Sequence, residues 1–176
     1  YGMIEQGRPL DAIMGLKAIG TFADQDDIDN SPKQMFGAVR PGDIKYMDMN
    51  GDGMLDSSDK VKIGSGTPKM ALALNIALAY KNFDLLANFY GHFGVKRYNY
   101  TKFQLQRLDQ VFNYGKEALN AWTPENKNTD IPRAVQGDPN GNNRVSDRFI
   151  ENGDYLRLNN LQIGYNLPSD ACKKIG

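Results

Sequence analysis

Several kinds of functional residue are scarce in this sequence. Its 176 residues include one cysteine, Cys172, and one histidine, His92. A single cysteine excludes an internal disulfide framework and a cysteine-based zinc site, so we interpret Cys172 as an incidental free thiol. Lys plus Arg equals Asp plus Glu at 21 each, which leaves no net charge to attract nucleic acid or an anionic membrane surface. We therefore expect no nucleic-acid partner.

Common targeting and membrane-spanning segments are also missing. Residues 1–10 lack the basic start and apolar run of a secretory signal peptide. No apolar run approaches the roughly 20 residues of a membrane helix. Tyr1 is not an initiator methionine, and the last two residues follow two lysines without a terminating element. We expect the chain to be a piece of a longer protein.

Catalytic motifs are equally absent. The sequence has no Gly-x-Ser-x-Gly elbow, and Gly64-Ser65-Gly66 is not followed by a phosphate-binding pattern. The acidic residues concentrate in one loop instead of forming an acid–base pair. We predict that the chain is not an enzyme and holds no catalytic cofactor.

The densest chemical signal is PGDIKYMDMNGDGMLDSSD, residues 41–59. Acidic and amide side chains recur there at the spacing of a calcium-binding loop, with Gly53 where such a loop turns sharply. Calcium takes six to eight oxygen ligands, which these side chains can supply. The predicted ligands are Asp48, Asn50, Asp52, the backbone carbonyl of Met54, Asp56 (directly or through water) and Asp59.

Three features qualify this calcium prediction. Asp59 stands where a glutamate is usual, and its shorter side chain predicts weaker binding or a site that smaller cations share. The approach over residues 41–46 alternates like a strand and the exit over 60–67 is broken by glycine, so the loop is not an EF-hand. The alternative is that Asp, Asn and Gly gather here because loops favour them.

Eighteen Gly, nine Tyr and eight Phe indicate turns and aromatic strands, hence a mainly β chain. The clearest strand covers residues 70–80, where large apolar and small side chains alternate. Lys81-Asn82 makes a two-residue link, in which Asn82 can adopt positive φ. The return strand covers residues 83–93 and has a more polar second face with Asn88, Tyr90 and His92. We predict an antiparallel hairpin.

The same alternation fits two surroundings. A soluble sandwich turns its apolar face inward, whereas a membrane β-barrel turns that face toward lipid and places aromatic residues near the strand ends. Periodicity alone does not decide between them.

The remaining segments are predicted from composition and spacing. Residues 11–22 suit a twisted strand, and residues 23–33 suit an acidic turn with one helical turn before Pro32. Apolar residues at three- and four-residue spacing predict a helix near residues 103–121, loosened at Gly115. A polar connection over 123–147 precedes strands at 148–152 and 154–167. A change of phase in the last strand implies a bulge near Asn159.

Four phrases carry a resemblance to a known family. They are GDIKYMDMNGDGMLDSSDKVKIGSGTPK, LALAYKNFDLLANFYGHFG, ALNAWTPENKNTDIPRA and RFIENGDYLRLNNLQIGYNLP. In this order they resemble the late barrel of the SusC/RagA-type TonB-linked outer-membrane proteins, the TonB-dependent receptors. The resemblance runs from about Pro9 onward. Asn82 stands where the family's hairpin usually has Gly, and Lys127 stands where Pro is common.

The resemblance implies antiparallel strands from a transmembrane β-barrel of about 22 strands with a plug. Such receptors import glycans or peptides across the outer membrane of Gram-negative bacteria, powered by TonB, with a SusD-type lipoprotein. This chain would form part of one barrel domain. Its segments would be a strand and acidic extracellular loop (1–40), a metal-binding-like extracellular loop (41–67), a barrel hairpin with a periplasmic turn (68–93), a long extracellular loop containing the helix near 103–121 (94–147), and strands running to a periplasmic turn (148–176).

Within that frame calcium would be structural. Asn88, Tyr90 and His92 would face the barrel lumen, either meeting the substrate or only hydrating a polar interior, and the apolar face would meet outer-membrane lipid. The alternative function is a secreted soluble calcium-binding β module with an adhesive or carbohydrate-binding role.

Overall fold

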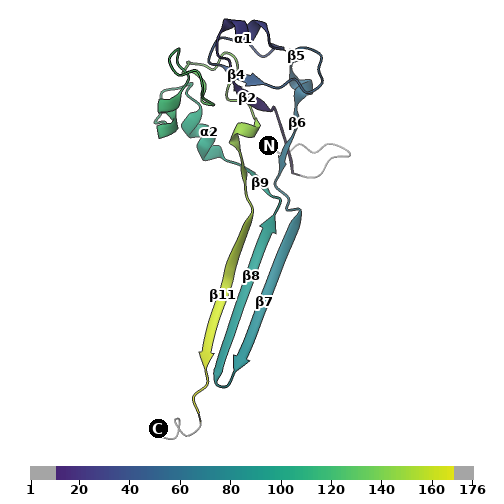
Figure 1. Cartoon of the computed structure of the whole chain (residues 1–176), viewed down its shortest axis with the longest axis vertical. Coiled ribbons are helices and arrows are strands. Elements are labelled where there is room, and N and C mark those ends of the chain that lie inside the picture. The colour runs from purple at the N-terminus through teal and green to yellow at the C-terminus, as the bar shows by residue number, and fades with distance from the viewer. Residues whose placement is uncertain (1–10, 169–176) are drawn as a thin grey trace. The chain divides into compact units, whose positions relative to one another are not determined.

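The structure, a computed structural model, describes residues 11–168 (Figure 1). The chain divides into two compact units. One, here called the loop unit, includes described residues 11–66 and 96–151. The other, called the sheet unit, includes described residues 67–95 and 152–168. No helix in the described part is long and apolar enough to cross a membrane.

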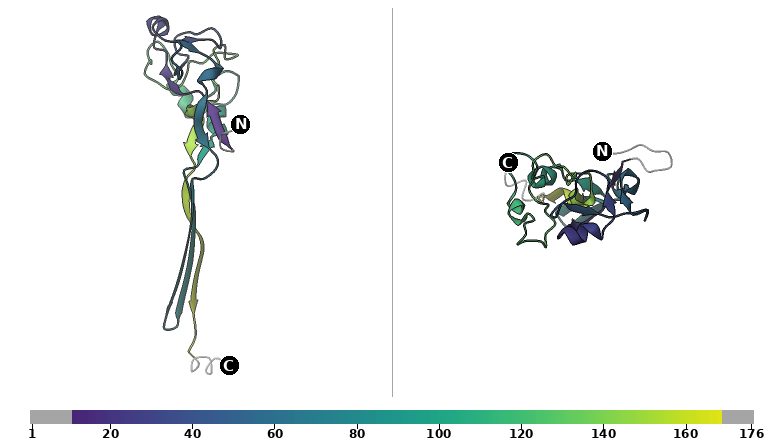
Figure 2. Two further views of the ribbon diagram at one scale, coloured as in Figure 1. Left: turned by 90° about the vertical axis from the view of Figure 1, so that its right-hand side faces the viewer. Right: turned by 90° about the horizontal axis from the view of Figure 1, so that it is seen from above.

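The sheet unit is a three-stranded antiparallel sheet. Its order is β11-β8-β7, with β7 at Met70–Tyr80, β8 at Phe83–Phe93 and β11 at Tyr155–Tyr165. Strands β7 and β8 pair without interruption from Met70↔Phe93 to Tyr80↔Phe83, which confirms the predicted hairpin. Figure 2 shows these strands from a second direction as a single layer.

The hairpin turn differs from the prediction in one detail. Lys81 has the positive φ of 54°, and Asn82 does not. Both turn types that suit two-residue hairpins require positive φ at the first central residue. Lys81 occupies that position, so it carries the left-handed conformation.

Strand β11 contains the predicted bulge. Its register against β8 shifts between Leu158 and Asn160. Leu156 and Leu158 pair with Gly91 and Phe89, and after the bulge Leu161 and Ile163 pair with Ala87 and Leu85. Directly paired side chains in a sheet point to the same side. Without a bulge, the even-numbered Leu156 and Leu158 and the odd-numbered Leu161 and Ile163 would point to opposite faces. The bulge therefore places all four on one face.

This face of the sheet unit is apolar and open. We call it the apolar face, and its large members are Met70, Leu72, Leu74, Ile76, Leu78, Tyr80, Phe83, Leu85, Phe89, Phe93, Leu156, Leu158, Leu161, Ile163 and Tyr165. Leu74 is 50% exposed and Ile163 is 71% exposed. The opposite, polar face carries Asn75, Asp84, Asn88, Tyr90, His92, Tyr155, Arg157, Asn160 and Gln162.

The loop unit is built from short paired strands. Strand β1 (Ala12–Gly15) pairs with β6 (Val61–Ser65), and β2 (Ala18–Thr21) pairs with β4 (Ile44–Tyr46). Strand β3 (Lys33–Gln34) runs parallel to β5 (Met54–Leu55), and β9 (Lys96–Tyr98) pairs with β10 (Ile150–Asn152). The strand predicted over residues 11–22 is thus two strands, β1 and β2.

Helical segments in the loop unit are short. Helix α1 (Gln25–Asp29) confirms the helical turn before Pro32, and the Asp24 side chain caps its first turn. Helix α2 spans Tyr100–Gln106. The described residues also form three short 3₁₀ helices: η1 (Ser57–Asp59), η2 (Lys116–Asn120) and η3 (Asp147–Phe149).

The helix predicted near residues 103–121 is wrong beyond Gln106. Leu108 has φ of 39°, a left-handed conformation that an α-helix cannot continue through. Arg107 bonds Asp109 through two contacts of 2.6 and 2.9 Å, which holds the chain in this turn. Val111 is 97% exposed and Leu119 91%. Their helical spacing therefore does not form a packed face.

A small core holds the loop unit together. Leu16, Ile44, Tyr46 and Leu55 are buried against one another, and Ala18 and Phe36 pack against them. These residues come from β2, β4, β5 and their neighbours, so the core fixes the segment that leads into the predicted metal loop.

Candidate functional site

The predicted metal loop lies between β4 and β6. Asp48 accepts hydrogen bonds from the backbone amides of Gly51 and Gly53 at 2.6 and 2.9 Å. Both glycines have positive φ, 77° and 80°, so they supply the backbone conformation that closes the turn. The two amides, Gly51 first, lower the pKa of the Asp48 carboxyl because they stabilise its charged form.

The second half of the loop is tied by a capping box. Asp56 accepts from the Ser58 amide at 2.7 Å, and Asp59 accepts from the Asp56 amide at 2.8 Å. Hydrogen bonds from the Ser58 hydroxyl and amide lower the pKa of Asp56. Asp59 is fully buried, and its other oxygen accepts from the Met49 amide at 2.8 Å. Asp59 thus connects the two ends of the loop.

The remaining predicted ligands also bond within the loop. Asn50 donates from Nδ2 to Asp52 Oδ2 at 2.9 Å and to Ser58 Oγ at 3.1 Å. Asp52 Oδ1 accepts from the Met54 amide at 2.8 Å. Among residues 11–168 no group of three or more His, Cys, Asp or Glu side chains is arranged to hold a metal ion. The oxygen chemistry suits calcium, and each of the four carboxylates accepts a hydrogen bond from a backbone amide of the loop.

Tyr90 and His92 form an aromatic cluster on the polar face of the sheet unit. The Tyr90 hydroxyl contacts His92 Nε2, and the Tyr155 hydroxyl lies 3.3 Å from Nδ1. The Arg157 guanidinium lies 5.6 Å from the centre of the Tyr155 ring. Asn88 lies farther along β8, in register with Asn75 and Asn160. Tyr155 and Arg157 were missed by sequence reasoning, although their alternation with Leu156 and Leu158 places them on this face.

A buried polar network in the loop unit was also not predicted, because no local sequence pattern marks it. Asp43 is fully buried and accepts from Arg133 Nε at 2.7 Å, Asn142 Nδ2 at 3.1 Å and the Arg40 amide at 2.9 Å. Arg133 in turn donates its backbone amide to Gly42 at 2.8 Å. The segments that meet here are about 90 residues apart in sequence, which is why no spacing rule reveals the contact.

Side chains complete the hydrogen bonding of β4. Ile44 donates its amide to Asn142 Oδ1 at 2.7 Å and its carbonyl accepts from Gln34 Nε2 at 3.2 Å. Gln34 Oε1 accepts from the Tyr46 amide at 3.0 Å, and Gln34 Nε2 also donates to Asn140. All three of these amide side chains are buried. The network therefore fixes the segment 133–142 on the core of the loop unit.

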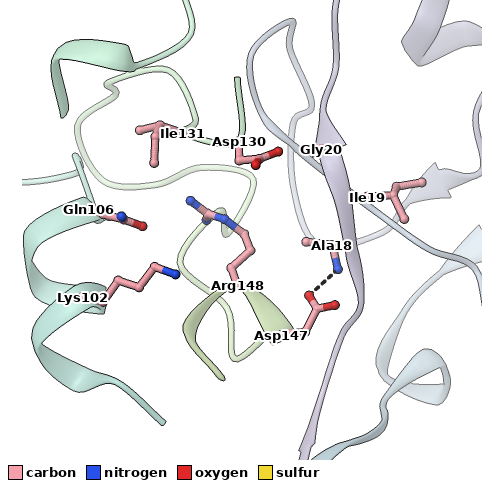
Figure 3. A pocket seen from close by; sticks show the side chains of 9 residues that line it. All are labelled: Ala18, Ile19, Gly20, Lys102, Gln106, Asp130, Ile131, Asp147 and Arg148. Carbon is pink, nitrogen blue, oxygen red and sulfur yellow. Dashed lines mark hydrogen bonds between the residues drawn. The ribbon is translucent and has the colours of Figure 1, made fainter. Parts of the chain in front are cut away.

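A cavity also lies in the loop unit (Figure 3). It encloses about 590 Å³ beside residues Ala18–Gly20 of β2. Its other walls come from Lys102, Gln106, Asp130, Ile131, Asp147 and Arg148. Sequence reasoning did not identify this cavity, because four separate segments form it.

The polar groups around this cavity are only partly satisfied. Asp147 Oδ1 accepts from the Ala18 amide at 2.9 Å. Arg148 donates from Nη1 to the Asn142 carbonyl at 3.2 Å, while its Nη2 is buried without a hydrogen-bond partner among the described residues. Burial lowers the pKa of Arg148. The Gln106 side chain points into the cavity, is 7% exposed and makes no hydrogen bond with any described residue.

Comparisons with known proteins give concordant relatives. No protein-family model matches the chain. The chain is 34% identical over 169 residues to TonB-dependent receptor P26 of Formosa agariphila, covering 93% of this chain and 16% of that protein. It is 29% identical over 130 residues to TonB-dependent receptor SusC of Bacteroides thetaiotaomicron, covering 74% of this chain and 12% of SusC. The chain therefore spans no more than about a sixth of these relatives.

Solved structures show the same fold. The RagAB peptide importer in its closed-closed state matches 97% of this chain and 18% of the importer chain, with a TM-score of 0.68 and 22% identity. A second structure, of the RagAB peptide transporter, matches the same share of this chain with a TM-score of 0.70 and 21% identity. The mainly β fold is thus shared with segments of β-barrel structures.

Proposed function

The chain belongs to the TonB-dependent receptors of the SusC/RagA type, and from this premise we propose that it is part of a transporter in the outer membrane of a Gram-negative bacterium. The whole receptor would import glycans or peptides, powered by TonB, together with a SusD-type surface lipoprotein. The relatives that are named as receptors and the neighbours that are named as a peptide importer support this proposal. We propose no catalytic role for the chain.

The observation that carries the proposal is the contrast between the two faces of the sheet unit. Three strands of 11 residues each match the roughly 9–11 residues with which a tilted strand crosses a bilayer. Leu72, Leu74 and Leu161 on the apolar face are 43%, 50% and 54% exposed. Burying such side chains in hydrocarbon stabilises the protein, whereas exposing a patch of this size to water is unusual for a soluble monomer.

The polar face is then the side we assign to the lumen. Asn88, Tyr90 and His92 lie there in register with polar residues of β11, namely Asn160, Arg157 and Tyr155. We propose that they line the path of the substrate, and that the Lys81-Asn82 turn is periplasmic while the loop unit lies outside the cell. A structural calcium ion in the loop over residues 48–59 remains a prediction.

Cysteine accessibility tests the assignment of the two faces. In the full receptor that carries this segment, with Cys172 replaced by serine, Leu74→Cys should react with a lipid-soluble maleimide and resist a membrane-impermeant one. Asn75→Cys is the matched control, because it is adjacent in sequence and on the opposite face. We expect Asn75→Cys to react with the polar reagent.

Two results would contradict the proposal. Equal reaction of both cysteines with the polar reagent would favour the soluble β module. Uptake by cells that lack TonB, at the rate seen in cells that contain it, would show that the receptor does not transport by the proposed mechanism.

A further inference from the structure

The cavity beside β2 and α2 has the dimensions of a ligand site. Its volume of about 590 Å³ lies within the roughly 300–1,000 Å³ that is typical of small-molecule sites. The transport proposal assigns no role to this cavity, which lies entirely in the loop unit. Figure 3 shows side chains from four separate segments lining it.

Gln106 is the first sign that the cavity accepts a ligand. An amide carries two donor hydrogens and an acceptor oxygen, and burying these groups unpaired costs free energy. Gln106 is 7% exposed and points into the cavity without a partner in the described part of the chain. A ligand with both a donor and an acceptor would satisfy it, and a peptide group has both.

The charges around Gln106 are of both signs. Lys102 lies one helical turn before Gln106 on α2, so both side chains face the same way. Its Nζ forms an ion pair with Glu151 at 3.8 Å, a distance too long for a hydrogen bond, and both side chains remain partly exposed. Arg148 adds a second positive charge, and its Nη2 is buried with no hydrogen-bond partner among residues 11–168. Lys102 and Arg148 together therefore favour a carboxylate on the ligand.

Asp130 supplies the complementary negative charge. Its side chain borders the cavity on the side facing Gly20 (Figure 3). Asp147 is already bound to the Ala18 amide. The Asp130 side chain, whose charge also acts on Arg148, accepts no hydrogen bond from the described residues and can receive an ammonium group. No aromatic side chain of the described residues lines the cavity, so this part of the chain offers no ring surface on which neutral sugars commonly stack.

We propose that this cavity binds a short zwitterionic peptide. The ligand carboxylate lies toward Lys102 and Arg148, a peptide group bonds the Gln106 amide, and the terminal ammonium lies toward Asp130. The apolar wall formed by Ile131 accommodates a small side chain of the peptide. This proposal concerns a site outside the sheet unit and does not depend on transport.

Calorimetry on the detergent-solubilised full receptor tests the proposal with three probes. Trialanine is the zwitterionic probe, N-acetyl-trialanine amide is its uncharged counterpart, and maltotriose is a neutral sugar of similar length. We expect trialanine to bind at least about tenfold more tightly than the blocked peptide, because hydrogen bonds to charged groups are the strong ones. We expect no measurable binding of maltotriose in this cavity.

Variants locate the binding to this cavity. Gln106→Leu removes the amide at similar volume, and Lys102→Met removes the charge while keeping the stem. Each should weaken trialanine binding by about tenfold. Lys116→Met is the control, because Lys116 is exposed on η2 and does not line the cavity. If Gln106→Leu fails to fold, Lys102→Met alone decides, since that side chain is 35% exposed.

Several outcomes overturn the proposal. They are no trialanine binding, equal binding of the blocked peptide, tighter binding of maltotriose, or unchanged affinity in both variants. The result also separates this inference from transport. A receptor that imports its substrate without binding trialanine contradicts only the cavity proposal, whereas trialanine binding without TonB-dependent uptake contradicts only the proposed function.

Discussion

The two units of this chain are stabilised by different kinds of contact. In the sheet unit, backbone hydrogen bonds join three long strands, and large apolar side chains remain open on one face. In the loop unit the strands have two to five residues, and buried side chains such as Asp43 and Asn142 bond segments that are far apart in sequence. The stability of the sheet unit therefore depends on what covers its apolar face, whereas the stability of the loop unit depends on a few internal polar contacts.

The largest effect should come from breaking the network of the loop unit. Asp43→Ala removes the acceptor of Arg133 and leaves a mostly buried guanidinium without its partner. We expect a loss of about 3–5 kcal/mol in the stability of this unit, the usual result of breaking a buried ion pair. Hydrogen–deuterium exchange of residues 122–142 in the full receptor measures it.

The control for Asp43 is an exposed ion pair of the same unit. Asp24 lies 3.6 Å from Lys127, and both side chains are about half exposed. Asp24→Ala should therefore change protection by no more than roughly 1 kcal/mol. Equal effects of the two substitutions would mean that burial does not distinguish these contacts.

The sheet unit should respond instead to a charge on its apolar face. Leu74→Arg should cost about 2–4 kcal/mol of folding free energy in lipid vesicles, because the charge would enter hydrocarbon near mid-strand. Asn75→Arg is the matched variant, and we expect it to cost much less in a hydrated lumen. The comparison is measured by urea titration of the full receptor in vesicles, and similar costs at both positions would contradict the assignment of the faces.

Calcium should have a smaller effect, confined to the loop over residues 48–59. Binding in the weak range of about 10⁻⁴–10⁻³ M would stabilise this loop by about 1.4 kcal/mol at ten times the dissociation constant. Weak binding is expected because Asp59 is short and because Asp48 and Asp59 must release backbone amides. Calorimetry with calcium should show binding that Asp52→Ala abolishes and Asp24→Ala preserves. If no heat of binding is seen at saturating calcium, the prediction is wrong, and the acidic and amide residues serve only the loop's own hydrogen bonds.

The smallest expected effect is the pH dependence of the same loop without metal. The pKa values of Asp48 and Asp56 are lowered by hydrogen bonds from the loop. A lowered pKa in the folded state means that the stabilisation is complete above the ordinary value of about 3.9. It is lost as the pH falls through the folded-state pKa. Exchange of the Gly51 and Gly53 amides, corrected for its intrinsic pH dependence, should rise in that window. Asp48→Asn should remove most of the change.

The predictability of the two units follows from the range of their contacts. Strands β7 and β8 were predicted to the residue because alternation and a two-residue turn are local properties, and the bulge at Asn159 followed from a local change of phase. Their surroundings did not follow, because lipid and a protein core select the same alternation.

The loop unit was less predictable. The helix near residues 103–121 failed because spacing cannot report the left-handed turn at Leu108. Gln106 and Arg148, which lie on one cavity, are 42 residues apart in the chain, and no pattern links them. The metal loop shows a further limit, since the spacing of its oxygen atoms is visible in the sequence while their orientation is not.

The bulge in β11 gives this strand one residue more than the stretch of β8 with which it pairs. Eleven residues of β11 cover the ten residues of β8 from Phe83 to His92. Successive side chains in a strand point to opposite faces, so inserting one residue changes the face of every residue after it. The extra residue, Asn159, therefore keeps the apolar residues before and after it on the same face. Deleting this single residue would require one run to exchange faces with its polar neighbours. A one-residue change in length at Asn159 is therefore a larger alteration than most substitutions in the same strand.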